Sequence, residues 1–232
     1  MYLVRHGETE FNKLGQIQGW MDSPLTEYGL EVARYCGLGL KDIPFDVAYS
    51  SDLMRAVKTT EVILSQNEQK GIPHHPLDEL KEISFGKFGG GLKDSYKKDV
   101  SKVLLGKESL DELNDKMHLK EVTVKELIDA GYSLDLSGES ENYTDFENRI
   151  VQATKDIFKT AQTKGHRKIL VVGHGIAIFA ILNYLSDKHI NYISDVKNAS
   201  VTLLKYENEE VFVEDIASMD YVNTGEKASK LQ

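Results

Sequence analysis

Apolar positions along the chain fall into short runs that alternate with longer periodic stretches. Three short apolar runs predict β-strands: Tyr2–Val4, Phe45–Tyr49 and Lys168–Val172. Apolar residues at helical spacing predict helices over residues 25–40, 53–64 and 178–185. Thr26 is the expected N-cap of the first of these helices. Because strands and helices alternate, the sequence predicts a mostly parallel sheet with helices on both faces.

Further elements are predicted in the C-terminal half of the chain. The segment Thr144–Glu147 has the pattern of a capping box and predicts the start of another helix. Val201–Tyr206 and Val211–Ile216 read as strands on either side of Asn208 and Glu209, which predicts a hairpin. The last dozen residues are polar, and we expect them to be frayed.

Residues 92–140 are charged and only weakly periodic. Helical segments are predicted around Val100–Leu105 and Val124–Ile128. We interpret this stretch as an insertion over the C-terminal edge of the strands, within a single domain of residues 1–232. The predicted fold class is therefore α/β: a three-layer α/β/α sandwich with a mostly parallel central sheet and a helical insertion. Ligands of such sheets bind beyond the C-terminal ends of the strands.

Composition restricts the class of protein and of partner. The 232 residues are 41% hydrophobic, which is typical of a globular chain. A net charge of −9 argues against binding to nucleic acid or to an anionic membrane. No apolar run approaches the roughly 20 residues that span a bilayer, and no secretory signal is visible. Cys36 is the only cysteine, so no intrachain disulfide can form, and we expect a cytoplasmic protein.

Cationic side chains gather at three predicted strand ends. The first strand ends in Arg5-His6-Gly7, Arg55 follows the second, and the strand over residues 168–172 ends in Gly173-His174-Gly175. In a parallel sheet these ends share one edge, where helix N-termini also present free N–H groups. Gly7 and Gly175 lack a Cβ, so a ligand or another backbone can approach closely, and both tolerate a positive φ. Each element alone is weak, but together they predict a pocket for a phosphate dianion.

These residues belong to a longer ordered set of motifs. The segments are Leu3–Asn12, Gln18–Thr26, Ser50–Ala56, Glu82–Gly90, Gly138–Ser140 and Val172–Gly175. In this order they resemble the signature of the histidine phosphatase superfamily, in its phosphoglycerate mutase-like branch. The resemblance covers about residues 1–90 and 136–206.

The resemblance implies a role for each matching residue. His6 would be the nucleophile that forms a phosphohistidine, and Glu82 would donate a proton to the leaving oxygen. Arg5, Arg55 and His174 would bind the phosphoryl oxygens. The remaining substrate-binding positions would be Asn12, Gln18, Gly19 and Gly175. This chemistry needs neither a metal nor a cofactor, since covalent catalysis and the cationic clamp suffice.

Other candidates are weaker. Asp78 and Glu79 are expected to be solvated surface residues, and His74 and His75 to lie in a solvent-facing loop. Cys36 lacks the arginine six residues later that a cysteine phosphatase loop requires. There is no G-x-x-x-x-G-K-[ST] loop, and no residue set has metal-ligand spacing.

The resemblance leaves hydrolysis and mutase transfer as alternatives. The mutase branch has an arginine at the position of Gln16 and an arginine pair in the insertion. Residues 92–140 contain lysines but no arginine. Lysine does not supply the fixed bidentate donors that hold a carboxylate. We therefore predict a phosphomonoesterase acting on a small phosphorylated metabolite. A phosphoglycerate mutase is the alternative, with Lys93, Lys97 or Lys98 replacing the arginines. A non-catalytic phosphate-binding protein on the same fold is the second alternative.

Overall fold

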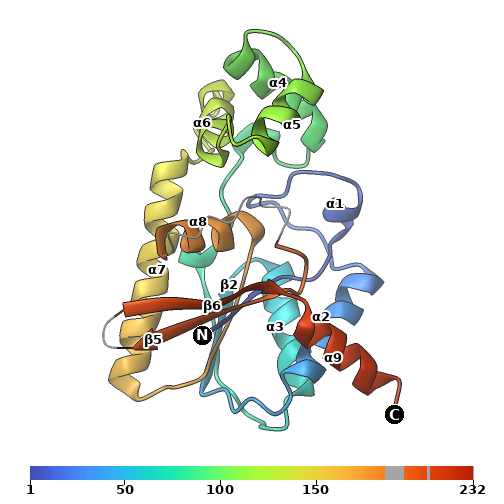
Figure 1. The fold of residues 1–232 in the computed structure, drawn as a ribbon, viewed down its shortest axis with the longest axis vertical. Helices are drawn as coiled ribbons and strands as arrows, with labels where there is room; N and C mark the ends of the chain where they lie inside the picture. The colour runs from blue at the N-terminus through green and yellow to red at the C-terminus, as the bar shows by residue number, and fades with distance from the viewer. Residues whose placement is uncertain (186–195, 208–209, 232) are drawn as a thin grey trace.

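The computed structural model describes residues 1–185, 196–207 and 210–231, and it contains a six-stranded sheet (Figure 1). The strand order is β3-β2-β4-β1-β5-β6. Four neighbouring strands are parallel, and β5 and β6 add an antiparallel edge. The strands are β1 (Tyr2–Arg5), β2 (Val47–Ser51), β3 (His74–Leu77), β4 (Ile169–Gly173), β5 (Val201–Glu207) and β6 (Glu210–Ser218). The predicted, mostly parallel sheet is confirmed.

Helices cover both faces of this sheet. They are α1 (Glu10–Lys13), α2 (Glu27–Gly39), α3 (Met54–Gln66), α4 (Lys93–Leu105), α5 (Leu110–His118), α6 (Val124–Leu134), α7 (Tyr143–Lys164), α8 (Gly175–Leu185) and α9 (Asp220–Ser229), with two 3-10 turns, η1 (Asp78–Leu80) and η2 (Gly86–Phe88). Alternate strand residues face opposite layers, as strand geometry requires. Leu3 and Val171 pack in the core formed with α7 and α8, whereas Val4 and Val172 pack against α2 and α3. The three-layer sandwich is confirmed.

The insertion forms its own small core at one end of the molecule. Helices α4, α5 and α6 gather together in Figure 1, and Tyr96, Val100 and Leu113 are buried between them. Ile17 and Phe85 from the main body join this cluster, so the insertion packs on the rest of the chain. The expected helices around residues 100–105 and 124–128 are parts of α4 and α6, whereas α5 was not predicted. Among the described residues, no helix is long and apolar enough to cross a membrane.

Two local predictions need correction, and the strands of the predicted hairpin are confirmed. Helix α7 begins at Tyr143, because Asn142 caps it by accepting from the backbone N–H of Asp145 at 3.0 Å, so the Thr144 capping box is wrong. His74 and His75 lie in β3 and not in a loop, and the His74 ring contacts the Ser50 hydroxyl at 2.9 Å. The proposed hairpin is formed by β5 and β6, but its turn at residues 208–209 lies outside the described residues.

The C-terminal segment is a packed helix, and the expectation of a frayed end is wrong. Helix α9 crosses α2 closely enough that a Cβ at Gly39 would lie 2.0 Å from the Tyr221 carbonyl oxygen. A Cβ at Gly225 would lie 1.8 Å from the Tyr35 carbonyl oxygen. The two glycines therefore permit backbone contact between the helices. Val222 is buried in the core on the same side of the sheet.

Candidate active site

The ends of β1 and β4 place two histidines side by side. The strands are parallel neighbours with Arg5 opposite Gly173, and the His6 backbone N–H donates to the Gly173 carbonyl at 3.0 Å. The next side chains, His6 and His174, have ring centroids 5.2 Å apart. Strand β2 pairs with the other side of β4, and Arg55 follows it in the first turn of α3. The predicted convergence of three strand ends is therefore observed.

The His6 ring is set up as a neutral base. Its Nδ1 lies 2.7 Å from the Gly7 carbonyl oxygen, which can only accept, so Nδ1 carries the hydrogen and Nε2 keeps its lone pair. Burial, followed by the charges of Arg55 and Arg5, lowers the pKa of His6 well below its ordinary value. The ring is thus unprotonated at neutral pH, with Nε2 as the available nucleophilic atom.

Two arginines supply fixed positive charge beside His6. Arg55 is 2% exposed, and it donates to the Gly19 carbonyl at 2.7 Å and to the Asp22 carboxylate at 3.0 Å. Arg5 donates to the Val196 carbonyl oxygen. The Nε atoms of both guanidinium groups are buried and have no hydrogen-bond partner within residues 1–185, 196–207 and 210–231. Buried cationic donors of this kind are costly unless an anion accepts from them, which is consistent with a site for phosphate.

His174 is more deeply placed than the other predicted site residues. It is completely buried, and neither ring nitrogen has a hydrogen-bond partner in the part of the chain that the structure describes. Burial, followed by the neighbouring charges of Arg55 and Arg5, lowers its pKa well below the ordinary histidine value. His174 contacts the ring of His6 but is not among the residues that line the main cavity, unlike His6, Arg5 and Arg55.

Glu82 lies at the N-terminus of α8. Its carboxylate accepts from the backbone N–H groups of Ile176 at 3.0 Å, Ala177 at 3.1 Å and Ile83 at 3.1 Å. The side chain is nevertheless deeply buried, and burial raises the pKa of Glu82 against the opposing effect of these N–H groups and of Arg55. A carboxyl group with a raised pKa retains its proton to higher pH, as a general acid requires.

The polar neighbours of His6 are held by local hydrogen bonds. Asn12 accepts from the Thr9 backbone N–H at 3.3 Å in a capping box at the start of α1. Gln18 accepts from the Ser23 hydroxyl at 3.2 Å. Asn198 donates to the His6 carbonyl at 2.9 Å and to the Asn12 side-chain oxygen at 3.5 Å. Asn12 and Gln18 line the cavity, as predicted for substrate-binding residues.

The glycines at the site serve different purposes. Gly19 has a φ of +54°, and a Cβ there would lie 2.8 Å from the Ile83 carbonyl oxygen. Gly7 has no positive φ, but a Cβ would lie 2.5 Å from the Gly29 carbonyl oxygen, so it allows close backbone contact. Gly175 lines the cavity as the first residue of α8 and also lacks a positive φ. The expectation of close approach is met at Gly7, whereas neither Gly7 nor Gly175 uses its tolerance of positive φ.

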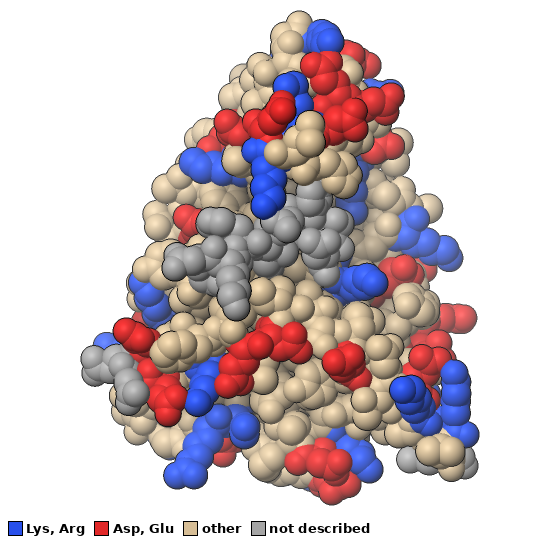
Figure 2. Space-filling model, viewed as in Figure 1, with Lys and Arg blue, Asp and Glu red and all other residues tan. Residues whose placement is uncertain are grey.

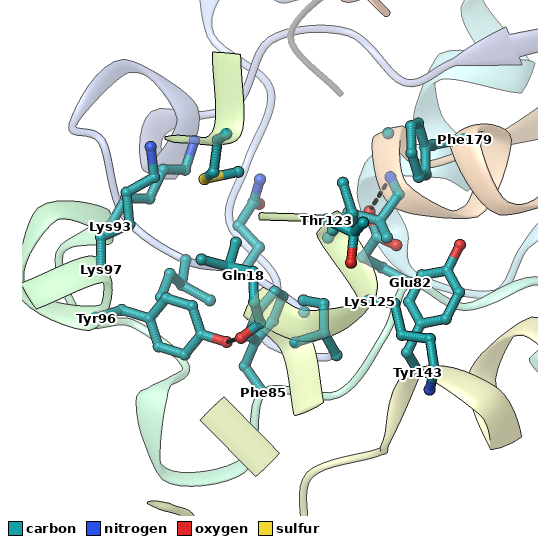
Figure 3. A pocket seen from close by; sticks show the side chains of 18 of the residues that line it. Gln18, Glu82, Phe85, Lys93, Tyr96, Lys97, Thr123, Lys125, Tyr143 and Phe179 are labelled. Atoms are coloured by element: carbon teal, nitrogen blue, oxygen red, sulfur yellow. Dashed lines mark hydrogen bonds between the residues drawn. The ribbon is translucent and has the colours of Figure 1, made fainter. Parts of the chain in front are cut away.

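A cavity of about 810 Å³ connects these residues to the insertion. In Figure 3, Lys93 and Lys97 lie on one side of it, and Thr123, Tyr143 and Phe179 lie on the other side, close to Glu82. Lys97 donates to the Asn114 side chain at 2.8 Å. Burial, followed by the charges of Arg5 and Lys97, lowers the pKa of Lys93. Within the described residues, no group of three or more His, Cys, Asp or Glu side chains is arranged to hold a metal ion.

Comparison with known proteins identifies the family. A family model described as the histidine phosphatase superfamily (branch 1) matches residues 1–218. The chain belongs to the histidine phosphatase superfamily. A 2,3-bisphosphoglycerate-dependent phosphoglycerate mutase from Staphylococcus haemolyticus is 30% identical over 198 residues, which are 81% of this chain and 84% of that protein.

Solved structures of this superfamily confirm the fold. The crystal structure of a phosphoglycerate mutase from Bacillus anthracis has a TM-score of 0.87 at 36% identity, over 97% of this chain and 95% of that one. A phosphoserine phosphatase from Entamoeba histolytica, in complex with 3-phosphoglyceric acid, has a TM-score of 0.68 at 25% identity, over 95% of this chain and 98% of that one. The similar superfamily members thus include both a mutase and a phosphatase.

Several side chains at this histidine phosphatase site were not predicted. Asn198 had no expected role, although it donates to the His6 carbonyl and to the Asn12 side chain. Trp20 donates its ring N–H to the Glu82 carbonyl at 2.8 Å, and Arg149 contacts the same carbonyl from α7. No pattern in the sequence pointed to Arg149, because the carbonyls that it contacts are about 70 residues away in the chain.

Proposed function

We propose that this histidine phosphatase superfamily member is a phosphomonoesterase that hydrolyses a small phosphorylated metabolite. The observation that carries the proposal is the neutral Nε2 of His6 in a cavity that is also lined by two buried arginines and by a buried carboxyl group with a raised pKa. A nucleophile, an anion clamp and an acid are the parts that phosphoryl transfer through a covalent intermediate requires.

In the first step, Nε2 of His6 attacks phosphorus and the bond to the ester oxygen breaks. The electron pair of that bond leaves with the oxygen, which takes the proton of Glu82. The guanidinium groups of Arg5 and Arg55, including their unpartnered Nε atoms, bind the phosphoryl oxygens during transfer. The Gly7 carbonyl accepts from Nδ1 and stabilises the positive charge that develops on the ring.

In the second step, water attacks the phosphohistidine. Glu82, now a carboxylate, takes a proton from the water as the new P–O bond forms. The P–N bond breaks, and its electron pair returns to Nε2. The products are inorganic phosphate, neutral His6 and protonated Glu82, which is the starting state of the site. Glu82 therefore acts first as an acid and then as a base.

The cationic wall of the cavity favours hydrolysis over mutase transfer. Arg5 and Arg55 are the only arginines among the described residues that line it, and the insertion contributes only lysines as fixed cations. Lysine binds an anion as a point charge and does not fix the plane of a carboxylate. A cavity of about 810 Å³ also offers a three-carbon bisphosphate little confinement, since pockets of this size bury much larger ligands.

A phosphoglycerate mutase remains the second candidate. It is supported by the names of the relatives with 30% and 36% identity and by the position of Lys93, partly buried in the cavity near Arg5. Lys93 and Lys97 would then hold the carboxylate that an arginine pair holds elsewhere in the branch.

Two assays separate the candidates. Hydrolysis of p-nitrophenyl phosphate that disappears in His6→Ala would support an enzyme, and its absence in the wild type would support a non-catalytic phosphate-binding protein. Adding 3-phosphoglycerate with a catalytic amount of 2,3-bisphosphoglycerate then distinguishes the two enzymes. We expect either release of inorganic phosphate or no reaction, and in both cases no formation of 2-phosphoglycerate. Formation of 2-phosphoglycerate faster than phosphate would favour the mutase.

A further inference from the structure

The segment that carries Glu82 contains little regular structure of its own. It runs from the short turn η1 to Phe85 without a strand or an α-helix. Arg149, on α7, crosses this segment and donates to three of its backbone carbonyls. The distances are 3.0 Å to Glu79, 3.0 Å to Lys81 and 3.4 Å to Glu82. A single guanidinium group therefore fixes the backbone on the N-terminal side of the Glu82 carboxyl group.

Glu141 holds Arg149 and also binds the other side of the segment. Its carboxylate accepts from Arg149 at 2.9 Å and 2.7 Å in a bidentate pair. One of the same oxygens accepts from the Ser84 backbone N–H at 2.9 Å, and the Glu141 N–H donates to the Ser84 carbonyl at 3.0 Å. The two side chains are about 20% exposed, so the pair is shielded from full screening.

The Arg149–Glu141 pair holds the backbone on both sides of the Glu82 carboxyl group. Glu82 bonds to the first turn of α8 through its side chain, while its carbonyl points back toward Trp20 and Arg149. A shift of the backbone at residues 81–84 would displace the carboxyl group from the α8 N–H groups and from the cavity. A displacement of the carboxyl group by about 1 Å can lower the rate on the order of 10²-fold.

We propose that Arg149, locked by Glu141, is a positioning residue that places Glu82 for proton transfer. This inference rests on the proposed function of Glu82 as the general acid. Arg149 is not among the residues that line the cavity, so its effect must pass through the segment that it holds.

The test compares two leaving groups in single-turnover experiments. Glycerol 3-phosphate leaves as a basic alkoxide and needs the acid, whereas p-nitrophenyl phosphate needs it little. Arg149→Lys keeps the charge but cannot form the bidentate pair and the carbonyl contacts together. We expect a loss of about 10²-fold in the first step with glycerol 3-phosphate and a much smaller loss with p-nitrophenyl phosphate. Arg34→Lys is the matched control, because Arg34 bonds to Ser229 and lies over the Tyr35 ring, does not line the cavity, and should change neither rate.

Variants of Glu82 distinguish the positioning role of Arg149 from the proposed role of Glu82 as the general acid. If Glu82→Gln shows the same leaving-group dependence and the double variant is no slower than Glu82→Gln alone, the positioning role is supported. An equal loss with both substrates in Arg149→Lys, or additive losses in the double variant, would overturn it while Glu82 remains the acid. A Glu82→Gln variant without leaving-group dependence would overturn both. Should Arg149→Lys not fold, Glu141→Gln weakens the same pair and must show the same selectivity.

Discussion

His6 and Glu82 both have pKa values displaced from the ordinary range, and the two displacements have opposite consequences. The pKa of His6 is lowered, so the nucleophile is ready at neutral pH, whereas the pKa of Glu82 is raised, so the acid keeps its proton longer. Both displacements follow from burial, because burial disfavours the charged form of a side chain whether the charge is positive or negative. Burial at this site thus prepares a base and an acid together.

The raised pKa of Glu82 predicts a pH dependence that differs between substrates. First-step turnover of an alkyl phosphate should fall as pH rises through the pKa of Glu82, because the fraction of protonated acid falls. With p-nitrophenyl phosphate this basic limb should be weak. Both substrates share the ionisation of the phosphate group, so comparing their pH–rate profiles isolates the enzyme's acid. Identical basic limbs for the two substrates would contradict the assignment.

The lowered pKa of His6 predicts a change in stability with pH. Above the unfolded-state value near 6.5 the ring is neutral in both states, so it adds no pH dependence. As pH falls below that value, the unfolded chain binds a proton that the native site refuses, and the free energy of unfolding decreases. His6→Asn should therefore lose less stability than the wild type between pH 7.5 and pH 5.5 in urea titrations. Parallel losses in the two proteins would show that His6 titrates normally in the folded state.

At the scale of elements, the loop that contains Gly19 contacts both Arg55 and the segment that carries Glu82. Its carbonyl accepts from Arg55, and its backbone packs against Ile83, next to Glu82. Gly19→Ala adds the strain of a positive φ, about 1–2 kcal/mol, and a collision with the Ile83 carbonyl. We expect both a lower melting temperature and a fall in kcat/KM of about 10²-fold.

Gly15 provides the control for this substitution. Its φ is +66°, but a Cβ there would have no heavy atom within 4 Å. Gly15→Ala should therefore lose similar stability from backbone strain while kcat/KM stays close to the wild-type value. Equal loss of activity in the two variants would mean that the contact of Gly19 with Ile83 does not matter for catalysis.

The sequence predicted best the strands that are buried on both faces of the sheet. Strands β1 and β4 are buried apolar runs that end in chemically distinctive residues, so Arg5, His6 and His174 could be placed at one edge from order alone. The insertion was harder, because α4, α5 and α6 bury only a small shared core and keep charged outer faces. Helix α9 was missed because its packing depends on the glycines at the crossing with α2, which a periodicity search does not see.

Within the site, too, some residues could not be predicted from the sequence. Asn198 and Arg149 act through backbone carbonyls that are distant in the chain, and no local pattern shows such contacts. The start of α7 was misplaced by two residues, because Asn142 and Thr144 are both N-cap residue types and it is Asn142 that accepts from the backbone of the first turn. Residues proposed to take part in the reaction were thus easier to predict than residues that hold other residues in place.

At the scale of the whole molecule, positive charge is concentrated against the global balance. The net charge is −9, and the face in Figure 2 shows acidic and basic residues interspersed over the surface. Among the described residues, the cavity is lined by two acidic residues, Glu82 and Glu147, but by six basic ones: Arg5, Arg55, Lys93, Lys97, Lys120 and Lys125. Screening limits the diffuse negative charge to short range in salt, so an anion inside the cavity interacts mainly with these local cations.

This charge arrangement predicts catalysis without a metal. The arginines supply the fixed charge that a metal ion supplies in other phosphatases, and the described residues hold no metal-ligand cluster. Dialysis against EDTA should leave hydrolysis of p-nitrophenyl phosphate essentially unchanged. A loss that Mg²⁺ or Zn²⁺ specifically restores would reveal a metal-dependent step.

The most direct test of the account is to trap the phosphoryl group on His6. Rapid quenching without acid, after mixing with a ³²P-labelled substrate, should yield protein-bound phosphate that is labile to acid and stable to base. Peptide mapping should place it on His6, and His6→Ala should trap none. Equal labelling of the wild type and His6→Ala, or label mapped to another residue, would contradict the central claim that this histidine carries the phosphoryl group.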